Sequence, residues 1–319
     1  GSYLEGVIAM DLAITTAALR KEFGACTAVD GVTFEVEVGT VFGLIGANGS
    51  GKTTTLRMLL DIIRLTSGSI EVLGQDPRQG GASLRKRIGF LPGELRLEGR
   101  ATGRQILDFY GSVSGPIVPG AVEQLTERFG VDLDRPVGDL SRGNKQKVGL
   151  IQAFMHEPEL LILDEPTSGL DPLMKREFIQ LVREARDNGQ TVLLSTHILS
   201  EIQQCADSVL VLNKGRAVAN GDVESLRLTS IRYLHAGISG AQRDVVQDRL
   251  TRIGNVRDVV TSARAGGGIR LAATVDGPVD DLMKALAEFT ITDITIDEPD
   301  LEESVLSLYE KPVGGGHGA

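Results

Sequence analysis

The stretch VFGLIGANGSGKTT, residues 41–54, decides how the rest of the chain is interpreted. Its first five residues are apolar and partly β-branched and predict a buried strand, whereas residues 52–60 predict a helix. The glycines between them allow successive backbone N–H groups to converge on an anion, and the start of the helix adds further unpaired N–H donors. This order of strand, glycine-rich turn and helix therefore predicts a phosphate-binding site.

Residues 46–53 match the pattern G-x-x-x-x-G-K-[ST], the P-loop. In this motif Lys52 reaches the β- and γ-phosphates of a nucleotide, and the Thr53 hydroxyl binds Mg²⁺. An ordinary glycine turn is the alternative, but the flanking strand and helix favour the motif. The residues that we predict to bind the nucleotide here are Gly46, Asn48, Gly49, Ser50, Gly51, Lys52, Thr53 and Thr54.

The composition is that of a globular protein, with 319 residues of which 41% are hydrophobic and 24% are charged. The net charge of −10 and the pI near 5.0 argue against a broad nucleic-acid-binding surface, which would need a basic face, and leave a local basic patch open; we expect no nucleic-acid partner. No run of 18 apolar residues occurs, so we expect no membrane-spanning helix. Cys26 and Cys205 lack metal-ligand spacing and predict reduced thiols, each buried in the core of a cytosolic protein. Residues 1–9 look like a cloning remnant ahead of a native start at Met10.

The region before the P-loop predicts two strands, residues 12–19 and 33–41, with turn chemistry at Asp30-Gly31. Phe23 lies between them and could stack on a purine base, although a single Phe is more often part of the core. After the P-loop helix the sequence predicts short strands at residues 70–73 and 88–91.

Residues 101–140 predict a helical subdomain inserted into the nucleotide-binding fold. The loop at residues 113–120, with two prolines and two glycines, separates two helices. The apolar faces are Ile106, Phe109 and Tyr110 on the first helix and Val122, Leu125 and Phe129 on the second.

Ser141 is predicted to cap a helix that runs to about Met155. Gly143 and Asn144 would then lie at the start of this helix, where the helix dipole favours an anion. The segment therefore predicts a second anion site, with a plain capped helix as the alternative.

Residues 160–163 predict a buried strand with Asp164 and Glu165 at its carboxyl end, the edge at which parallel sheets bind ligands. We expect Asp164 to be a second Mg²⁺ contact and Glu165 to orient or deprotonate the attacking water. Residues 191–196 predict another buried strand, followed by His197. A lone histidine is usually structural, but its position at the same sheet edge favours a role in the site. A helix at residues 173–187 and a hairpin at residues 208–219 are also predicted.

In this order the residues resemble the ATP-binding subunits of ABC transporters. The resemblance covers roughly residues 12–226 and implies an α/β P-loop NTPase fold with a helical subdomain at about residues 101–155, within an ATP-binding domain at residues 10–226. It rests on the Walker A loop Gly46–Thr53, the signature Leu140-Ser141-Arg142-Gly143-Asn144, the Walker B strand ending in Asp164 with Glu165, the loop Ser168-Gly169-Leu170-Asp171, and His197.

The resemblance implies a Mg²⁺-dependent ATPase in which two copies of the chain close head to tail around two ATP molecules. By role, the matching residues are Thr53 and Asp164 for Mg²⁺, Glu165 for the general base, His197 for the γ-phosphate, Ser141, Gly143 and Asn144 for the ATP of the other copy, Asp171 for coupling between the sites, and Phe23 for adenine.

The sequence departs from the family pattern at two places, and these departures indicate a particular type of transporter. Arg142 and Asn144 replace a glycine and a glutamine of the signature, and Gly93 with Glu94 stands where the family has a glutamine that touches Mg²⁺. Glycine cannot make that contact, so Glu94 either replaces it or is an ordinary surface carboxylate. These variants resemble drug or antibiotic exporters, in which a separate transmembrane permease binds the ATPase at the cytoplasmic face of the membrane.

A soluble ABC ATPase acting on ribosomes or DNA is the alternative, but the chain has a single cassette, and the segment at residues 54–140 is too short for a long coiled coil. A nucleotide-binding regulator without turnover conflicts with the presence of both Glu165 and His197.

Residues 227–312 predict a separate ferredoxin-like domain, because strands and helices follow in the order β-α-β-β-α-β. The strands are expected at residues 231–234, 256–261, 269–275 and 291–296, and the helices at 241–253 and 280–289, the first with Val245, Val246, Leu250 and Ile253 inward. A last helix at residues 300–309 and a disordered tail at 313–319 would follow. A dimerisation or regulatory role and an inert appendage are equally open.

Overall fold

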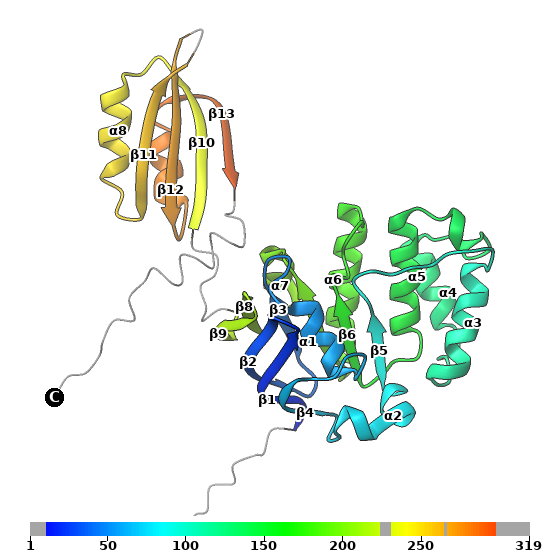
Figure 1. Ribbon diagram of the computed structural model, residues 1–319. Coiled ribbons are helices and arrows are strands. Elements are labelled where there is room, and N and C mark those ends of the chain that lie inside the picture. Colours follow the sequence, from blue (N-terminus) through cyan, green and yellow to red (C-terminus); the bar gives the residue numbers. More distant parts are fainter. Residues whose placement is uncertain (1–10, 224–230, 265–266, 298–319) are drawn as a thin grey trace, which may run out of the picture. The chain divides into compact units, whose positions relative to one another are not determined.

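The computed structural model describes residues 11–223, 231–264 and 267–297. The chain divides into two compact units, residues 1–226 and 227–319, each with its own core (Figure 1). The predicted leader at residues 1–9, the helix at 300–309 and the tail at 313–319 lie outside the described residues. No described helix is long and apolar enough to cross a membrane.

A six-stranded sheet forms the centre of the first unit (Figure 1). Its first five strands are parallel and only the last is antiparallel. Every residue of the three central strands is buried, which explains why they read as continuous apolar runs rather than as alternating ones. In spatial order the strands are β5 (Ile88–Leu91), β6 (Leu160–Asp164), β7 (Thr191–Thr196), β3 (Val41–Ile45), β8 (Ser208–Asn213) and β9 (Arg216–Asp222).

The register of the central strands places their carboxyl ends side by side. Ile45 pairs with Thr196 across β3 and β7, and Asp164 pairs with Ser195 across β6 and β7. The P-loop, the acidic pair after β6 and His197 therefore begin at the same edge of the sheet, as the sequence predicts.

A second, antiparallel sheet shares the core of this unit. It has the order β2-β1-β4 and contributes its buried side chains to the same apolar cluster as helix α1 (Lys52–Leu59). Phe34 of β2 stacks on Phe42 of β3 with ring centroids 5.5 Å apart, which joins the two sheets. The strands are β1 (Leu12–Phe23), β2 (Cys26–Glu37) and β4 (Ser67–Val72).

The expected turn at Asp30-Gly31 is wrong. β1 and β2 are longer than predicted, and the chain reverses at Gly24 and Ala25 instead. Gly31 has φ +71°, and the pairing shifts by one residue between Val29 and Val32, so Asp30-Gly31 forms a β-bulge inside β2. The predicted strand at residues 33–41 is likewise two strands in different sheets, separated by a turn at Gly39 with φ +73°.

Helices α3, α4 and α5 gather at one end of the first unit and form the expected helical subdomain (Figure 1). Val122, Leu125 and Phe129 of α4 are buried as predicted. The predicted face of the first helix is not buried, because Ile106 and Tyr110 are only half-buried and Phe109 is 62% exposed. The helices of this unit beyond α1 are α2 (Pro77–Arg85), α3 (Gly103–Ser114), α4 (Ala121–Phe129), α5 (Arg142–Phe154), α6 (Pro172–Asp187) and α7 (Leu199–Cys205). The sequence analysis did not predict α2 and α7.

The two cysteines lie in different environments. Both are free thiols, and Cys205 is buried as expected, but Cys26 is exposed next to the β1–β2 turn. The expectation of a core role for each is therefore wrong for Cys26.

The second unit has the split arrangement expected of a ferredoxin-like domain. Its antiparallel sheet has the order β11-β12-β10-β13, so β12 lies between β10 and β11, which are consecutive strands in the sequence. Val246 and Leu250 of α8 are buried, but Val245 is 53% exposed and does not point inward as predicted. The elements are β10 (Ile231–Ser239), α8 (Arg243–Thr251), β11 (Val256–Ala263), β12 (Ile269–Asp276), α9 (Asp280–Leu286) and β13 (Thr290–Asp297).

Candidate active site

Two positions of the loop between β3 and α1, Gly46 and Gly51, have no room for a side chain. A Cβ atom at Gly46 would lie 2.1 Å from Ser50 Oγ, and one at Gly51 would lie 2.7 Å from the Ala28 carbonyl oxygen. Gly51 also has φ +107° and is the N-cap of α1, with no side-chain hydrogen bond to the helix start. The first N–H groups of α1 are therefore left without a side-chain cap, as an anion-binding helix start requires.

The residues of this loop fit the phosphates of a nucleotide. The loop lines a cavity of about 290 Å³ together with Ala28 and Glu165. The buried ammonium of Lys52 donates to the carbonyl oxygens of Gly46 at 2.5 Å and Ala47 at 3.2 Å. Ser50 Oγ is buried without a partner among the described residues. A cation and an unpaired hydroxyl at a bare helix start suit a polyphosphate.

The two residues expected to bind Mg²⁺ lie in contact. Thr53 Oγ1 donates to Asp164 Oδ2 at 2.7 Å, and Ser195 Oγ donates to Asp164 Oδ1 at 2.5 Å. Oxygen donors of this kind suit Mg²⁺, which commonly takes only one or two carboxylates from the protein and completes its shell with phosphate and water. No cluster of three or more His, Cys, Asp or Glu side chains that could hold a metal ion occurs among the described residues.

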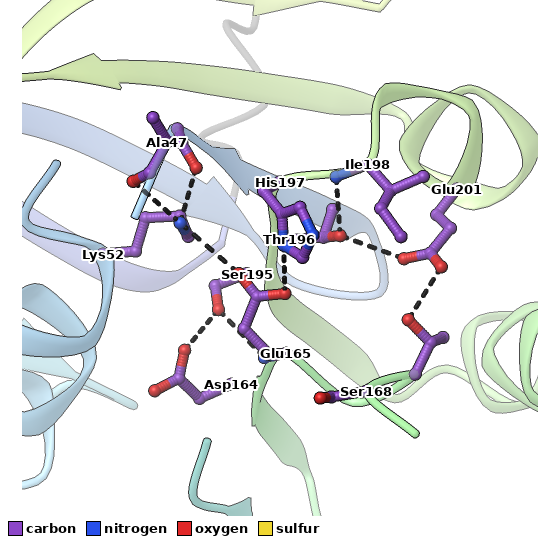
Figure 2. Close-up of polar contacts among 12 residues, drawn as sticks. Ala47, Lys52, Asp164, Glu165, Ser168, Ser195, Thr196, His197, Ile198 and Glu201 are labelled. Carbon is purple, nitrogen blue, oxygen red and sulfur yellow. Dashed lines mark hydrogen bonds and ion pairs between the residues drawn. The ribbon is translucent and has the colours of Figure 1, made fainter. Parts of the chain in front are cut away.

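Glu165 lies between the P-loop lysine and the histidine after β7. Its Oε1 is 3.4 Å from Lys52 Nζ and its Oε2 is 2.8 Å from His197 Nδ1 (Figure 2). Its side chain is 19% exposed, so solvent reaches it only in part. Lys52 and Glu165 line the cavity, and Glu165 joins them to the imidazole of His197, which lies 145 residues after Lys52 in the sequence.

The backbone at Glu165 is held in an uncommon conformation. Its φ is +48°, in the left-handed region that non-glycine residues rarely adopt. The Glu165 N–H donates to Ser195, to its carbonyl oxygen and to its Oγ, both at 3.1 Å. The buried amide of Gln146 donates to the carbonyl oxygen of Pro166 at 2.9 Å and more weakly to that of Glu165 at 3.4 Å. These contacts fix the direction in which the carboxylate points.

Ser195 and Gln146 are contacts that the sequence analysis missed. Ser195 belongs to a segment that was predicted only as a buried strand, and Gln146 belongs to the helix that follows the signature. A polar residue at a core position of an apolar strand or helix was the available signal, because such a residue needs a buried partner.

The signature residues lie at the start of α5 and contact the loop after Glu165. Ser141 Oγ accepts the Asn144 N–H at 3.2 Å as the predicted cap, and Arg142 donates to Ser168 Oγ at 2.8 Å. A Cβ at Gly143 would lie 2.7 Å from the Gly169 carbonyl oxygen, so the helix start and the loop are in close contact. Within the described part of the chain, no hydrogen bond joins Ser141, Gly143 or Asn144 to the P-loop. Asp171 Oδ1 accepts the N–H groups of Leu173 and Met174 and thereby caps α6.

Phe23 is 51% exposed at the end of β1, with Lys21 Nζ 4.7 Å from its ring centroid. It does not line the P-loop cavity. An exposed aromatic ring can accept a base, but the structure shows no closer tie between Phe23 and the site.

Gly93 lies against the site, whereas the side chain of Glu94 points to solvent. A Cβ at Gly93 would lie 2.8 Å from Asp164 Oδ2, so this backbone passes directly against the carboxylate that is expected to bind Mg²⁺. Glu94 has a side chain that is 75% exposed and pairs with Arg96 at 3.3 Å, as an ordinary surface carboxylate does.

Comparison with known proteins places this geometry in a family. Residues 29–168 match the family described as ABC transporter. The chain is 32% identical to the bacitracin transport ATP-binding protein BcrA of Bacillus licheniformis, over 96% of this chain and 99% of that protein. It is 34% identical to the daunorubicin resistance ATP-binding protein DrrA3 of Streptomyces coeruleorubidus, over 93% of this chain and 96% of that protein.

A solved structure described as the ATP binding subunit of an ABC transporter has the same fold, with a TM-score of 0.63 and 30% identity. It covers 67% of this chain and 92% of its own. The predicted P-loop NTPase fold is thereby confirmed. The chain belongs to the ABC transporter family and is one of its ATP-hydrolysing subunits.

Proposed function

We propose that two copies of this chain hydrolyse ATP in a closed dimer and drive a separate membrane permease that exports a drug-like or antibiotic compound. The contact of Glu165 with Lys52 and His197 beside the Asp164–Thr53 pair carries the proposal. Bound Mg²⁺ would be held by Thr53 and Asp164 and would offset the charge of the phosphates. Glu165 would accept a proton from the attacking water, and His197 would hold the γ-phosphate.

The dimer is supported by the division of the site. Ser141, Gly143 and Asn144 form an anion-binding helix start that faces the loop at residues 168–171 and makes no hydrogen bond to the P-loop of its own chain, within the described residues. A second copy placed head to tail would supply these groups to the ATP bound at the P-loop.

An apolar groove next to the site supports a protein partner. It has a volume of about 490 Å³ and lies between β5, α3 and α5. Ile62 and Val113, about half exposed, lie on its rim, and Phe90 and Pro92 lead from it toward Gly93. A permease segment bound in this groove would contact the stretch of backbone that leads to Gly93 and so to Asp164. The chain would then act on the cytoplasmic side of the membrane, through the permease.

Drug-like or antibiotic cargo is supported by the relatives, which are described as proteins of bacitracin transport and daunorubicin resistance. The similarity extends over nearly the whole of both proteins and so includes the second unit.

Glu165→Gln tests the site and the dimer together. It preserves the shape and removes the base, so we expect ATP binding to persist while turnover falls at least about a hundredfold. In sedimentation with ATP and Mg²⁺, the variant should accumulate as a dimer, whereas the parent chain should not. Full turnover in Glu165→Gln would remove Glu165 as the base, and a monomer at saturating ATP would remove the closed dimer.

Affinity capture from detergent-solubilised membranes tests the permease. We expect a multi-spanning protein to co-purify with the chain, to be lost with Ile62→Glu in the groove, and to be retained with Val38→Glu, a similarly exposed valine outside the groove. Ribosomal proteins or nucleic acid without a membrane protein would instead support a soluble ABC ATPase.

A further inference from the structure

A buried carboxylate lies behind the site, on α7. Glu201 is four residues after His197 and only 5% exposed. It accepts a hydrogen bond from Thr196 Oγ1 at 2.9 Å (Figure 2). It also accepts one from Thr167 Oγ1 at 2.7 Å, and Lys175 Nζ lies 3.3 Å from its Oε1. These three partners come from the turn after β6, the end of β7 and α6.

Burial of the Glu201 carboxylate would destabilise the fold if its hydrogen-bond and ion-pair partners were absent. The same face of α7 is otherwise apolar, with Leu199, Ile202 and Cys205 buried. A leucine at position 201 would suit such a face, whereas burying an ion costs free energy that only well-placed partners offset. A purely structural ion pair with Lys175 would explain one of the three contacts and would leave the two threonine contacts unexplained.

The two threonines lie directly beside the residues that contact ATP in the proposed mechanism. Thr167 is two residues after Glu165, and Thr196 immediately precedes His197. Thr196 Oγ1 also accepts the Ile198 N–H at 3.0 Å, so the backbone on both sides of His197 is tied to Glu201 through one hydroxyl. The Thr167–Glu201–Thr196 bridge therefore spans the same two segments as the contact between Glu165 and His197.

We propose that Glu201 is a positioning residue for ATP hydrolysis, which through Thr167 and Thr196 fixes the distance between Glu165 and His197. The proposal deepens the proposed function and rests on the roles given there to Glu165 and His197. Glu201 itself is buried, touches no substrate and transfers no proton. Its effect is on geometry, to which turnover is sensitive because small displacements of reacting groups change rates steeply.

Thr167→Val tests the bridge most directly. Valine matches the shape of threonine but lacks the hydroxyl, and among the described residues the Thr167 hydroxyl bonds to Glu201 alone. Thr167→Ser restores the hydroxyl. Thr191→Val is the matched control, because Thr191 is equally buried on β7 but lies at the opposite end, where its hydroxyl accepts the Gly39 N–H at 2.9 Å.

We expect the kcat of the full chain to fall about tenfold or more in Thr167→Val, with the KM for ATP unchanged within about twofold. Thr167→Ser and Thr191→Val should keep the parent kcat. A loss of kcat in Thr191→Val as large as in Thr167→Val would show that loss of any buried hydroxyl has this effect, and would overturn the proposal.

A second readout does not depend on turnover. The chain has four histidines, so ¹⁵N-histidine labelling gives a simple spectrum in which His197→Gln identifies the His197 ring. Thr167→Val should shift the His197 ring resonances, whereas Thr191→Val should not. Unchanged His197 resonances in Thr167→Val would overturn the proposal. Failure of the base assignment would appear separately, as full turnover in Glu165→Gln.

Discussion

Among single residues, Gly93 matters because it has no side chain at the point where the backbone passes Asp164, the proposed Mg²⁺ ligand. The Asp164 carboxylate is 2% exposed and is held on one oxygen by Thr53 and on the other by Ser195. It has no room to move away from a Cβ placed 2.8 Å from Oδ2. A glutamine at this position, as the family pattern has it, would meet the same obstacle along this backbone path.

Gly93→Ala should therefore displace Asp164. We expect the Mg²⁺ concentration for half-maximal turnover to rise at least about tenfold, as is typical when a group that supports a metal ligand is disturbed. The measurement is a Mg²⁺ titration of ATPase activity. Gly254→Ala, where an added Cβ meets nothing within 4 Å, should leave the titration unchanged. An unchanged titration in Gly93→Ala would show that the loop adapts.

Most of the candidate site residues could be predicted from the sequence, because the motifs that contain them are short and local. The glycines, Lys52 and Thr53 follow from one eight-residue pattern, and Asp164, Glu165 and His197 follow from their places after buried strands. The supports from Ser195, Gln146 and Glu201 could not be predicted, since each depends on which polar group faces it across the fold.

Helix starts are the elements on which the site depends most. α1 begins without a side-chain cap and leaves its N–H groups free, whereas α5 begins at Ser141, whose hydroxyl already accepts the Asn144 N–H. If Ser141 also contacts the ATP of a second copy, its hydroxyl serves the helix and the ligand at once.

Ser141→Ala separates these two roles when it is compared with Thr102→Ala, which removes the matching cap of α3. Each should lower the free energy of unfolding by about 1 kcal/mol. Only Ser141→Ala should also raise the KM for ATP, because α3 has no part in the proposed site. Thermal unfolding and steady-state kinetics give both quantities. An equal effect of the two variants on KM would argue against a ligand contact at Ser141.

Elements were predicted well where every residue is buried. They were predicted poorly where the same residues are compatible with two local structures. The central strands are buried along their whole length, so their apolar runs have one interpretation. Asp30-Gly31 suits a tight turn and a bulge equally, and only the pairing of β1 with β2 decides between them. Val245 fits a helical apolar face by spacing, yet it lies just outside the part that the sheet covers.

At the scale of the whole molecule, each unit has a complete apolar core of its own. The cluster around Phe34 and Phe42 lies within the first unit, and the cluster around Leu234 and Leu250 lies within the second. Deletion of residues 227–319 should therefore leave the affinity for ATP unchanged within about twofold. Titration calorimetry on the shortened chain checks this. Loss of folded protein on deletion would show that the two units depend on each other.

The cysteines provide a probe of the first unit. Burial raises the pKa of the Cys205 thiol to about 12, so at pH 8 only about one thiol in ten thousand is ionised. We expect a thiol reagent to modify Cys26 quickly in the native chain and Cys205 only when the first unit unfolds. In Cys26→Ser, labelling should then follow unfolding by denaturant. Rapid labelling of Cys205 in native conditions would contradict this.

The left-handed backbone at Glu165 has a consequence for how this chain can change. Holding a non-glycine residue at φ +48° costs about 1–2 kcal/mol, which a glycine would not lose. At this position, glycine would therefore favour stability, whereas glutamate is needed for turnover. A lineage released from the need to hydrolyse ATP would be expected to drift toward glycine or asparagine here, so the identity of this one residue would record whether turnover is still under selection.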